Sequence, residues 1–132
     1  MSFVLDCSVA AAWLLGEDNP AARAHLQRAQ AEGAVVPALW LTELSNVMLT
    51  GVRRKRFTVG DAHAAIAAVR RLPIEIDRRD PATDMLIDTA ARLGLTAYDA
   101  HYLLLASRRR LPLATFDRQL AKAAAQAGIG VL

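Results

Sequence analysis

Short strand-like runs alternate with longer helix-like segments along this chain, and the alternation limits the fold more than any other feature. Four such runs occupy residues 3–5, 34–37, 73–76 and 111–115, and residues 130–132 could form a fifth. Strands separated by helices predict parallel βαβ units, with helices on both faces of the sheet. We therefore expect a three-layer α/β/α domain whose central parallel sheet has about four or five strands.

Helices are predicted between these runs, with ends marked by proline, glycine and capping residues. Thr58 and Asp61 form a capping-box pattern, and Gly33, Gly51 and Gly94 mark the ends of three helices. The expected helices span residues 9–15, 20–32, 39–49, 58–72, 82–93 and 96–109, and a last one opens at Asp117.

Composition fits one folded domain over residues 1–132, since 54% of the residues are hydrophobic and no linker or repeat interrupts the chain. The first residues lack the basic segment of a signal peptide, and no apolar run reaches the ~20 residues of a membrane span. We expect no membrane association. Cys7 is the only cysteine, which excludes a disulfide framework and suits the cytoplasm.

Four carboxylates stand out by their positions. Asp6 and Asp117 lie at the carboxyl ends of strand-like runs, Asp99 opens a helix, and Glu43 lies in the apolar stripe of another helix. Ligands of parallel sheets bind beyond the carboxyl ends of the strands, where Asp6 and Asp117 are expected. Carboxylates near a core are costly unless they are paired, protonated or bound to a cation. The set therefore predicts a shared acidic site for a divalent cation, Mg²⁺ or Mn²⁺.

Each acid taken alone also has a structural explanation. Asp6 and Asp117 could cap helices, and Asp99 stands in capping-box register with Thr96. Glu43 could lie at the edge of its stripe and extend to solvent, although no lysine or arginine lies within a helical turn of it. The functional hypothesis therefore depends on the four acids acting together.

Basic residues are clustered, although the net charge is only +3. The clusters occupy residues 53–56, 70–71, 78–79 and 108–110. Arginine favours bidentate contacts with phosphate, which would suit a polyanionic partner. Solvated charge at helix ends explains the same clusters equally well.

Four motifs of the chain, in order, resemble the PIN domain. They are Val-Leu-Asp-Cys-Ser (4–8), Pro-Ala-Leu-Trp-Leu-Thr-Glu-Leu (37–44), Thr-Ala-Tyr-Asp-Ala (96–100) and Leu-Ala-Thr-Phe-Asp (113–117). The resemblance covers nearly the whole chain, which looks like a VapC-type toxin of a bacterial or archaeal toxin–antitoxin pair. One departure is His101, which stands where the family usually has an apolar residue.

The resemblance implies a Mg²⁺- or Mn²⁺-dependent endoribonuclease. It implies that Asp6, Glu43, Asp99 and Asp117 form the active site, with the metal held by Asp6, Asp99 and Asp117. The hydroxyl residues Ser8 and Thr115 would support that site. The implied partners are an RNA substrate, a small antitoxin that covers the site and a second copy of the chain in a homodimer.

Two other classes of function remain open. A haloacid-dehalogenase-like phosphatase also begins with a strand-end aspartate, but its chemistry requires Asp-x-Asp, and Ser8 occupies the third position here. A non-catalytic nucleic-acid-binding module on the same fold would be indicated by loss of an acid, and none of the four is missing. The three histidines lack metal-binding spacing, and no glycine-rich loop follows a strand.

Overall fold

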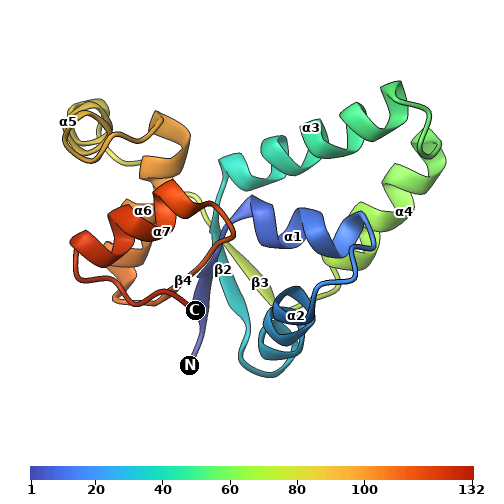
Figure 1. The fold of residues 1–132 in the computed structure, drawn as a ribbon, viewed down its shortest axis with the longest axis horizontal. Coiled ribbons are helices and arrows are strands. Elements are labelled where there is room, and N and C mark those ends of the chain that lie inside the picture. The colour runs from blue at the N-terminus through green and yellow to red at the C-terminus, as the bar shows by residue number, and fades with distance from the viewer.

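The predicted alternation of strands and helices folds into three layers, which a computed structural model describes for residues 1–132 (Figure 1). The strands are β1 (Phe3–Leu5), β2 (Ala34–Pro37), β3 (Ile74–Asp77) and β4 (Leu113–Ala114). All pair in parallel, in the order β3-β2-β1-β4. The predicted fold class is thus confirmed. Because β1 pairs with β2 on one side and β4 on the other, the strand order reverses there.

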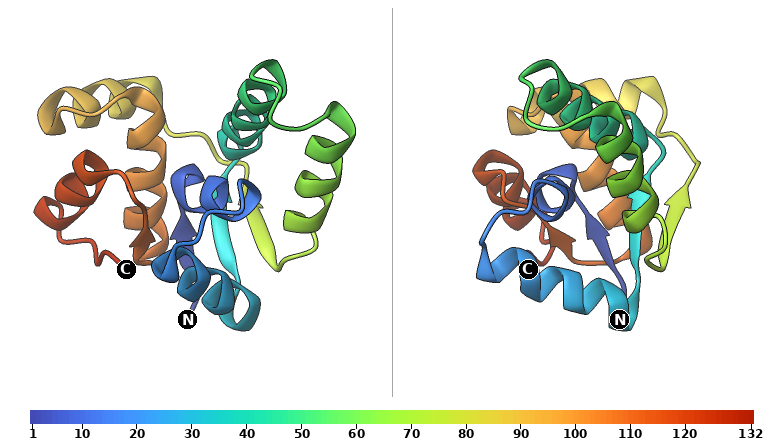
Figure 2. Two further views of the ribbon diagram at one scale, coloured as in Figure 1. Left: turned by 45° about the vertical axis from the view of Figure 1, so that its right-hand side comes forward. Right: turned by 90° about the vertical axis from the view of Figure 1, so that its right-hand side faces the viewer.

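Seven helices cover the two faces of this sheet (Figures 1 and 2). One face carries α1 (Cys7–Leu14), α2 (Pro20–Glu32), α3 (Leu39–Arg53) and α4 (Val59–Val69). The other carries α5 (Thr83–Leu93), α6 (Ala97–Arg109) and α7 (Arg118–Gln126). None of the seven is both long and apolar enough to cross a membrane.

The core forms where both faces of the sheet are covered. Every residue of β1 and β2 is buried, as expected of central parallel strands. Trp40 of α3 and Tyr102 of α6 are the largest fully buried side chains and pack from opposite layers. Trp13 of α1 donates its indole N–H to the carbonyl of Ala22 in α2 at 2.7 Å, which ties those two helices together.

Several element boundaries differ from the sequence prediction. The third helix does not stop at Gly51 but continues to Arg53, because Gly51 lies under the ring of Phe57 rather than at a helix end. The fourth helix ends at Val69, earlier than the expected residue 72. The last strand has only two residues, and Val131 adds a single bridge to Leu113 rather than a fifth strand.

The turn between α3 and α4 is built without glycine in its left-handed position. Lys55 has a φ of 58°, and the amides of Lys55 and Arg56 bond back to the carbonyls of Val52 and Gly51. This pattern is the Schellman motif, in which glycine usually occupies the left-handed site. The chain therefore accepts the strain of a lysine there.

Candidate active site

Asp6 is buried at the carboxyl end of β1 and is held by two hydroxyl groups. Ser8 Oγ donates to Asp6 Oδ2 at 2.6 Å, and Thr115 Oγ1 donates to the same oxygen at 2.7 Å. Asp6 precedes α1, yet its side chain makes no capping hydrogen bond. The capping explanation for Asp6 is therefore wrong. Neither hydroxyl uses the second oxygen, Oδ1.

The same two hydroxyls join the loops that follow β1 and β4. Ser8 Oγ accepts from the amide of Phe116 at 3.0 Å, and Thr115 Oγ1 accepts from the amide of Asp117 at 3.0 Å. The amide of Asp6 also donates to the carbonyl of Ala114 at 3.0 Å. These contacts hold Asp6 and the start of α7 side by side at the point where strand order reverses.

Asp117 combines a capping role with a free oxygen. Its Oδ1 accepts hydrogen bonds from the amides of Gln119 at 2.9 Å and Leu120 at 3.0 Å, so it caps α7 as predicted. Both bonds use the same oxygen, which leaves Oδ2 available. The structural role of Asp117 is real, but it engages only half of the carboxylate.

Asp99 lies at the start of α6, where the capping box is incomplete. Thr96 Oγ1 accepts from the Asp99 amide at 3.1 Å, but the Asp99 carboxylate does not return a bond to the Thr96 backbone. In α4 the predicted box is complete, since Asp61 does bond to the backbone of Thr58. The Asp99 carboxylate is therefore left for another role.

Burial raises the pKa of Asp99, and the charges of Asp117 and Asp6 raise it further, while a smaller contribution from the Thr96 hydroxyl lowers it. Like charges act in this way only at short range. Three of the predicted acids thus influence one another electrostatically, although they come from the ends of β1 and β4 and the start of α6.

Glu43 has a partner, Tyr102, that was not predicted from the sequence. Tyr102 Oη donates to Glu43 Oε1 at 2.5 Å, across a separation of 59 residues in the chain. Burial raises the pKa of Glu43, this hydrogen bond lowers it, and the charges of Asp6 and Asp99 raise it. One signal was present in the sequence, because Tyr102 lies three residues after Asp99 and so shares its face of α6.

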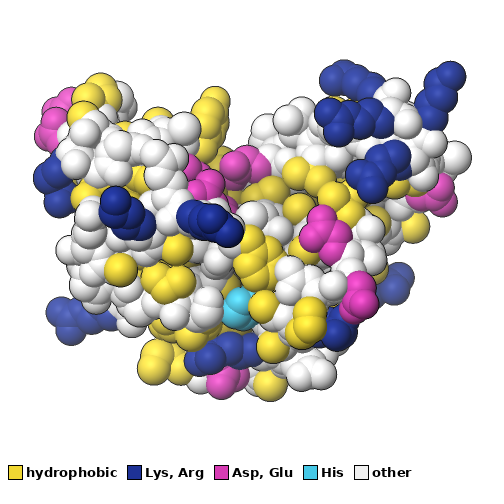
Figure 3. Space-filling model, viewed as in Figure 1, with side chains coloured by type: hydrophobic (Ala, Val, Ile, Leu, Met, Phe, Trp, Pro, Cys, Tyr) yellow, Lys and Arg dark blue, Asp and Glu magenta, His cyan; other side chains and the backbone are white.

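Asp6, Glu43, Asp99 and Asp117, which we call the four acids, thus act on one another electrostatically. Figure 3 shows acidic side chains in the hollow between the part of the molecule formed by α5, α6 and α7 and the part formed by α3 and α4. No three of the His, Cys, Asp and Glu side chains lie close enough in this structure to enclose one ion. The four acids are neighbours without being a closed cage.

The donors nevertheless fit a hard divalent cation. All are carboxylate oxygens, the ligands that Mg²⁺ and Mn²⁺ prefer. Protein hydrogen bonds fix one oxygen each of Asp6, Glu43 and Asp117 and leave the other unused by those bonds. Burial and the charges of neighbouring acids raise the pKa values of Glu43 and Asp99. A bound cation would offset this repulsion between the carboxylates.

Two other reactive side chains, Cys7 and His101, lie close to the four acids in the sequence. Burial, followed by the charges of Glu43 and Asp6, raises the pKa of the Cys7 thiol to about 12, so it is not a nucleophile. Burial lowers the pKa of His101, and the charged group that acts on it is Asp80. None of the four acids is among the charges that shift the pKa of His101.

The arginines differ in their contacts. Arg108 forms an ion pair of 3.0 Å with the buried Asp77 at the end of β3, and Arg109 pairs with Glu75. Burial raises the pKa of Asp77, but the amide of Arg79 and the guanidinium of Arg108 together hold it below its usual value. This cluster therefore serves the packing of α6 on β3.

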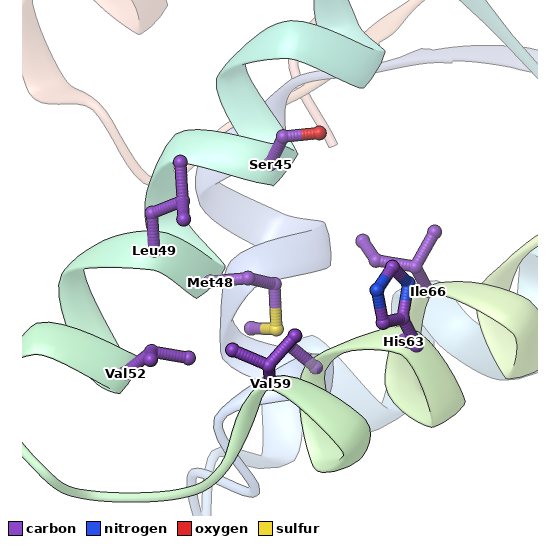
Figure 4. Close-up of a pocket in the computed structure, with 8 residues that line it drawn as sticks. Ser45, Met48, Leu49, Val52, Val59, His63 and Ile66 are labelled. Carbon is purple, nitrogen blue, oxygen red and sulfur yellow. The ribbon is translucent and has the colours of Figure 1, made fainter.

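An apolar groove of about 280 Å³ between α3 and α4 is separate from the four acids (Figure 4). Met48 and Val59 point into it from opposite helices, and His63 stands at its side. It is lined by Ser45, Met48, Leu49, Val52, Val59, Ala62, His63 and Ile66. With no carboxylate in its lining, it offers no site for the chemistry of the four acids.

Three solved structures resemble this one. PAE2754 from Pyrobaculum aerophilum is 25% identical, with a TM-score of 0.71 over 93% of this chain and 84% of that protein. A toxin–antitoxin complex from Klebsiella pneumoniae is 18% identical, with a TM-score of 0.66 over 98% of this chain and 95% of the other. FitAcB from Neisseria gonorrhoeae is also 18% identical, with a TM-score of 0.69 over 100% and 96%.

At 18% identity, the second and third of these structures support only a similarity of fold. No curated protein matches the sequence. The model of the PIN domain matches residues 3–126, which takes in β1, β4 and all seven helices. Because this match spans most of the chain, the chain belongs to the PIN domain family.

Proposed function

We propose that this protein is a metal-dependent endoribonuclease and the VapC-type toxin of a type II toxin–antitoxin pair. The observation that carries the proposal is that Ser8 and Thr115 join Asp6 to the loop that bears Asp117. The four acids also influence one another electrostatically. Members of the PIN domain family are generally nucleases. A toxin–antitoxin complex also shares the fold across nearly the whole chain.

Asp6, Asp99 and Asp117 are the residues proposed to hold Mg²⁺ or Mn²⁺. When bound, such a cation neutralises charge on a phosphate and lowers the pKa of a water molecule. Ser8 and Thr115 hold the Asp6 carboxylate through Oδ2 and leave Oδ1 unused by those bonds. The backbone of α7 fixes Asp117 in the same way.

Glu43 is proposed to accept a proton from the attacking water. Tyr102 holds Oε1, so Oε2 is the oxygen left to receive that proton. The raised pKa of Glu43 brings a carboxylate closer to the range in which a general base works well at neutral pH. We expect Glu43→Gln to lower the cleavage rate at least about a hundredfold while keeping the shape of the side chain.

The partners follow from the same proposal. They are RNA as substrate, a small antitoxin protein and a second copy of the chain in a homodimer, within the cytoplasm. Cys7, the only cysteine, is buried and free, which agrees with a reducing compartment. Sedimentation equilibrium at increasing protein concentration would show whether the dimer forms; a constant monomer mass would refute that part.

The haloacid-dehalogenase-like alternative has a specific weakness. Ser8 occupies the position of the second aspartate that this chemistry needs, and its hydroxyl donates to Asp6 instead of acting as an acid. A non-catalytic binding module is the other alternative. It does not explain why the Glu43 and Asp99 carboxylates are kept with raised pKa values near like charges.

The experiment incubates purified protein with mixed-sequence RNA in Mg²⁺, in Mn²⁺ or in EDTA, and with p-nitrophenyl phosphate in parallel. We expect metal-dependent RNA fragments and no release of nitrophenol. Asp6→Asn should abolish cleavage, whereas Glu17→Gln, the same charge change on an exposed acid outside the site, should not. RNA left intact in every metal, or nitrophenol release that Asp6→Asn abolishes, would refute the proposed function.

A further inference from the structure

One face of α3 runs from Glu43 to the far end of the helix. Asn46, Thr50 and Arg54 follow Glu43 at spacings of three and four residues, which places them on the same side of the helix. Eleven residues at about 1.5 Å each separate Glu43 from Arg54 by about 16 Å along the axis. This polar face therefore connects the four acids to the basic turn, which we define as residues 53–56.

A groove lies on this face at the end away from the four acids. It has a volume of about 230 Å³ and lies where the end of α1 approaches α3. Its lining combines polar side chains of α3 with two guanidinium groups of the basic turn. The lining residues are Leu15, Asn46, Val47, Thr50, Gly51, Arg54 and Arg56.

The charge in this groove is not neutralised within the protein. Arg23, Arg28, Arg108 and Arg109 all contact carboxylates, but no residue of the basic turn forms an ion pair. Figure 3 shows the Lys and Arg side chains gathered at the tip formed by the end of α3 and the start of α4. The turn itself is fixed, because the Schellman bonds of Lys55 and Arg56 and the packing of Phe57 on Gly51 hold it.

We infer that Arg54 and Arg56 form a phosphate-binding subsite for the RNA strand that leaves the four acids along α3. The inference rests on the proposed function, since it requires RNA as the ligand. Four carboxylates repel a polyanion, so the strand needs compensating positive charge within a few nucleotides of the cleaved bond. Guanidinium groups suit phosphate because they bind it with two parallel hydrogen bonds. Asn46 and Thr50 offer polar contacts on the way.

The test measures binding of a fluorescent single-stranded RNA in EDTA, where cleavage is absent, over a range of salt concentrations. The variant is Arg54→Gln with Arg56→Gln. Its matched control is Arg70→Gln with Arg71→Gln, which removes the same charge from exposed residues that follow α4 on the way to β3. Two lost phosphate contacts should reduce the salt slope by about 1.4 and weaken binding roughly twentyfold at about 0.1 M salt.

The control should keep the wild-type slope and affinity. Equal losses in both variants would overturn the inference, because they would reflect net charge rather than a site. An unchanged slope in Arg54→Gln with Arg56→Gln would overturn it as well. A cleavage assay in Mg²⁺ separates the two proposals. Absence of cleavage by wild type would refute the proposed function. Equally fast cleavage by wild type and by the Arg54/Arg56 variant would refute only the subsite.

Discussion

At the scale of single residues, substitution of Asp99 would show whether its carboxylate serves catalysis or caps a helix. Asp99→Asn should abolish RNA cleavage, yet leave the free energy of unfolding unchanged or higher in metal-free buffer. The substitution removes a charge that Asp117 and Asp6 repel, at the cost of a favourable interaction with the start of α6. Chemical denaturation in EDTA measures the change; a clear loss of stability would indicate that Asp99 is a cap.

The sign of this effect depends on pH. The pKa of Asp99 is raised in the folded protein above its ordinary 3.8, so between the two values the folded state binds more protons than the unfolded state. Unfolding free energy therefore falls as pH rises through that interval, and the penalty is complete above the folded pKa. Asp99→Asn should match wild type below pH 3.8 and gain on it as pH rises.

We propose that Tyr102 positions Glu43, and its effect should then appear in the pH profile of cleavage. Its hydrogen bond lowers the pKa of Glu43 against the effect of burial. Tyr102→Phe removes that bond, so the pKa of Glu43 should rise and the acid limb of the pH–rate profile should move to higher pH. A purely structural role would reduce stability and leave the limb in place, so both quantities should be measured on the same variant.

At the scale of elements, Gly51 shows how a contact overrides helix propensity. A Cβ at Gly51 would lie 2.2 Å from Cζ of Phe57, whereas one at Gly60 in α4 would meet only Thr58 Oγ1 at 3.6 Å. Alanine is normally better than glycine inside a helix by about 1 kcal/mol, and overpacking costs about 1–3 kcal/mol. We expect Gly51→Ala to destabilise the protein by about 1 kcal/mol and Gly60→Ala to stabilise it.

Thermal and urea denaturation of both alanine variants would check this prediction. Adding Phe57→Ala to Gly51→Ala should remove the clash, so the two changes together should cost less than their sum. If Gly51→Ala were as stabilising as Gly60→Ala, the Phe57 ring would move aside freely and would not explain why α3 continues past residue 49.

Features set by neighbours in the chain were predictable from the sequence, whereas contacts between distant residues were not. The strand–helix alternation, the capping box of Thr58 and Asp61 and the position of Asp6 after β1 depend on neighbours in the chain, and they were predicted correctly. The pairing of Tyr102 with Glu43 joins residues 59 apart, and no local pattern encodes it. Gly51 misled the prediction because a glycine that ends a helix and one that admits a ring look alike in sequence.

At the scale of the whole molecule, acidic and basic charges occupy different ends of one surface. Asp6 and Asp117 lie where the strand order reverses. The basic turn lies about 16 Å from Glu43 along the axis of α3. Two arginines in the last turn of α6, Arg108 and Arg109, form ion pairs with β3. Clusters that looked equivalent in the sequence therefore differ, because only the folded chain determines which arginines have a carboxylate within reach.

A cation that binds the four acids should stabilise the whole fold. Binding to the folded state alone adds about 2.7 kcal/mol to the free energy of unfolding at a concentration one hundred times Kd. Denaturation of wild type with Mg²⁺ and with EDTA should show this difference, and Asp99→Asn should show much less of it. Glu17→Gln removes a charge from an exposed acid outside the site and should respond like wild type. An equal response in Asp99→Asn would mean that Mg²⁺ binds elsewhere, because a site that includes Asp99 loses a charged ligand in that variant.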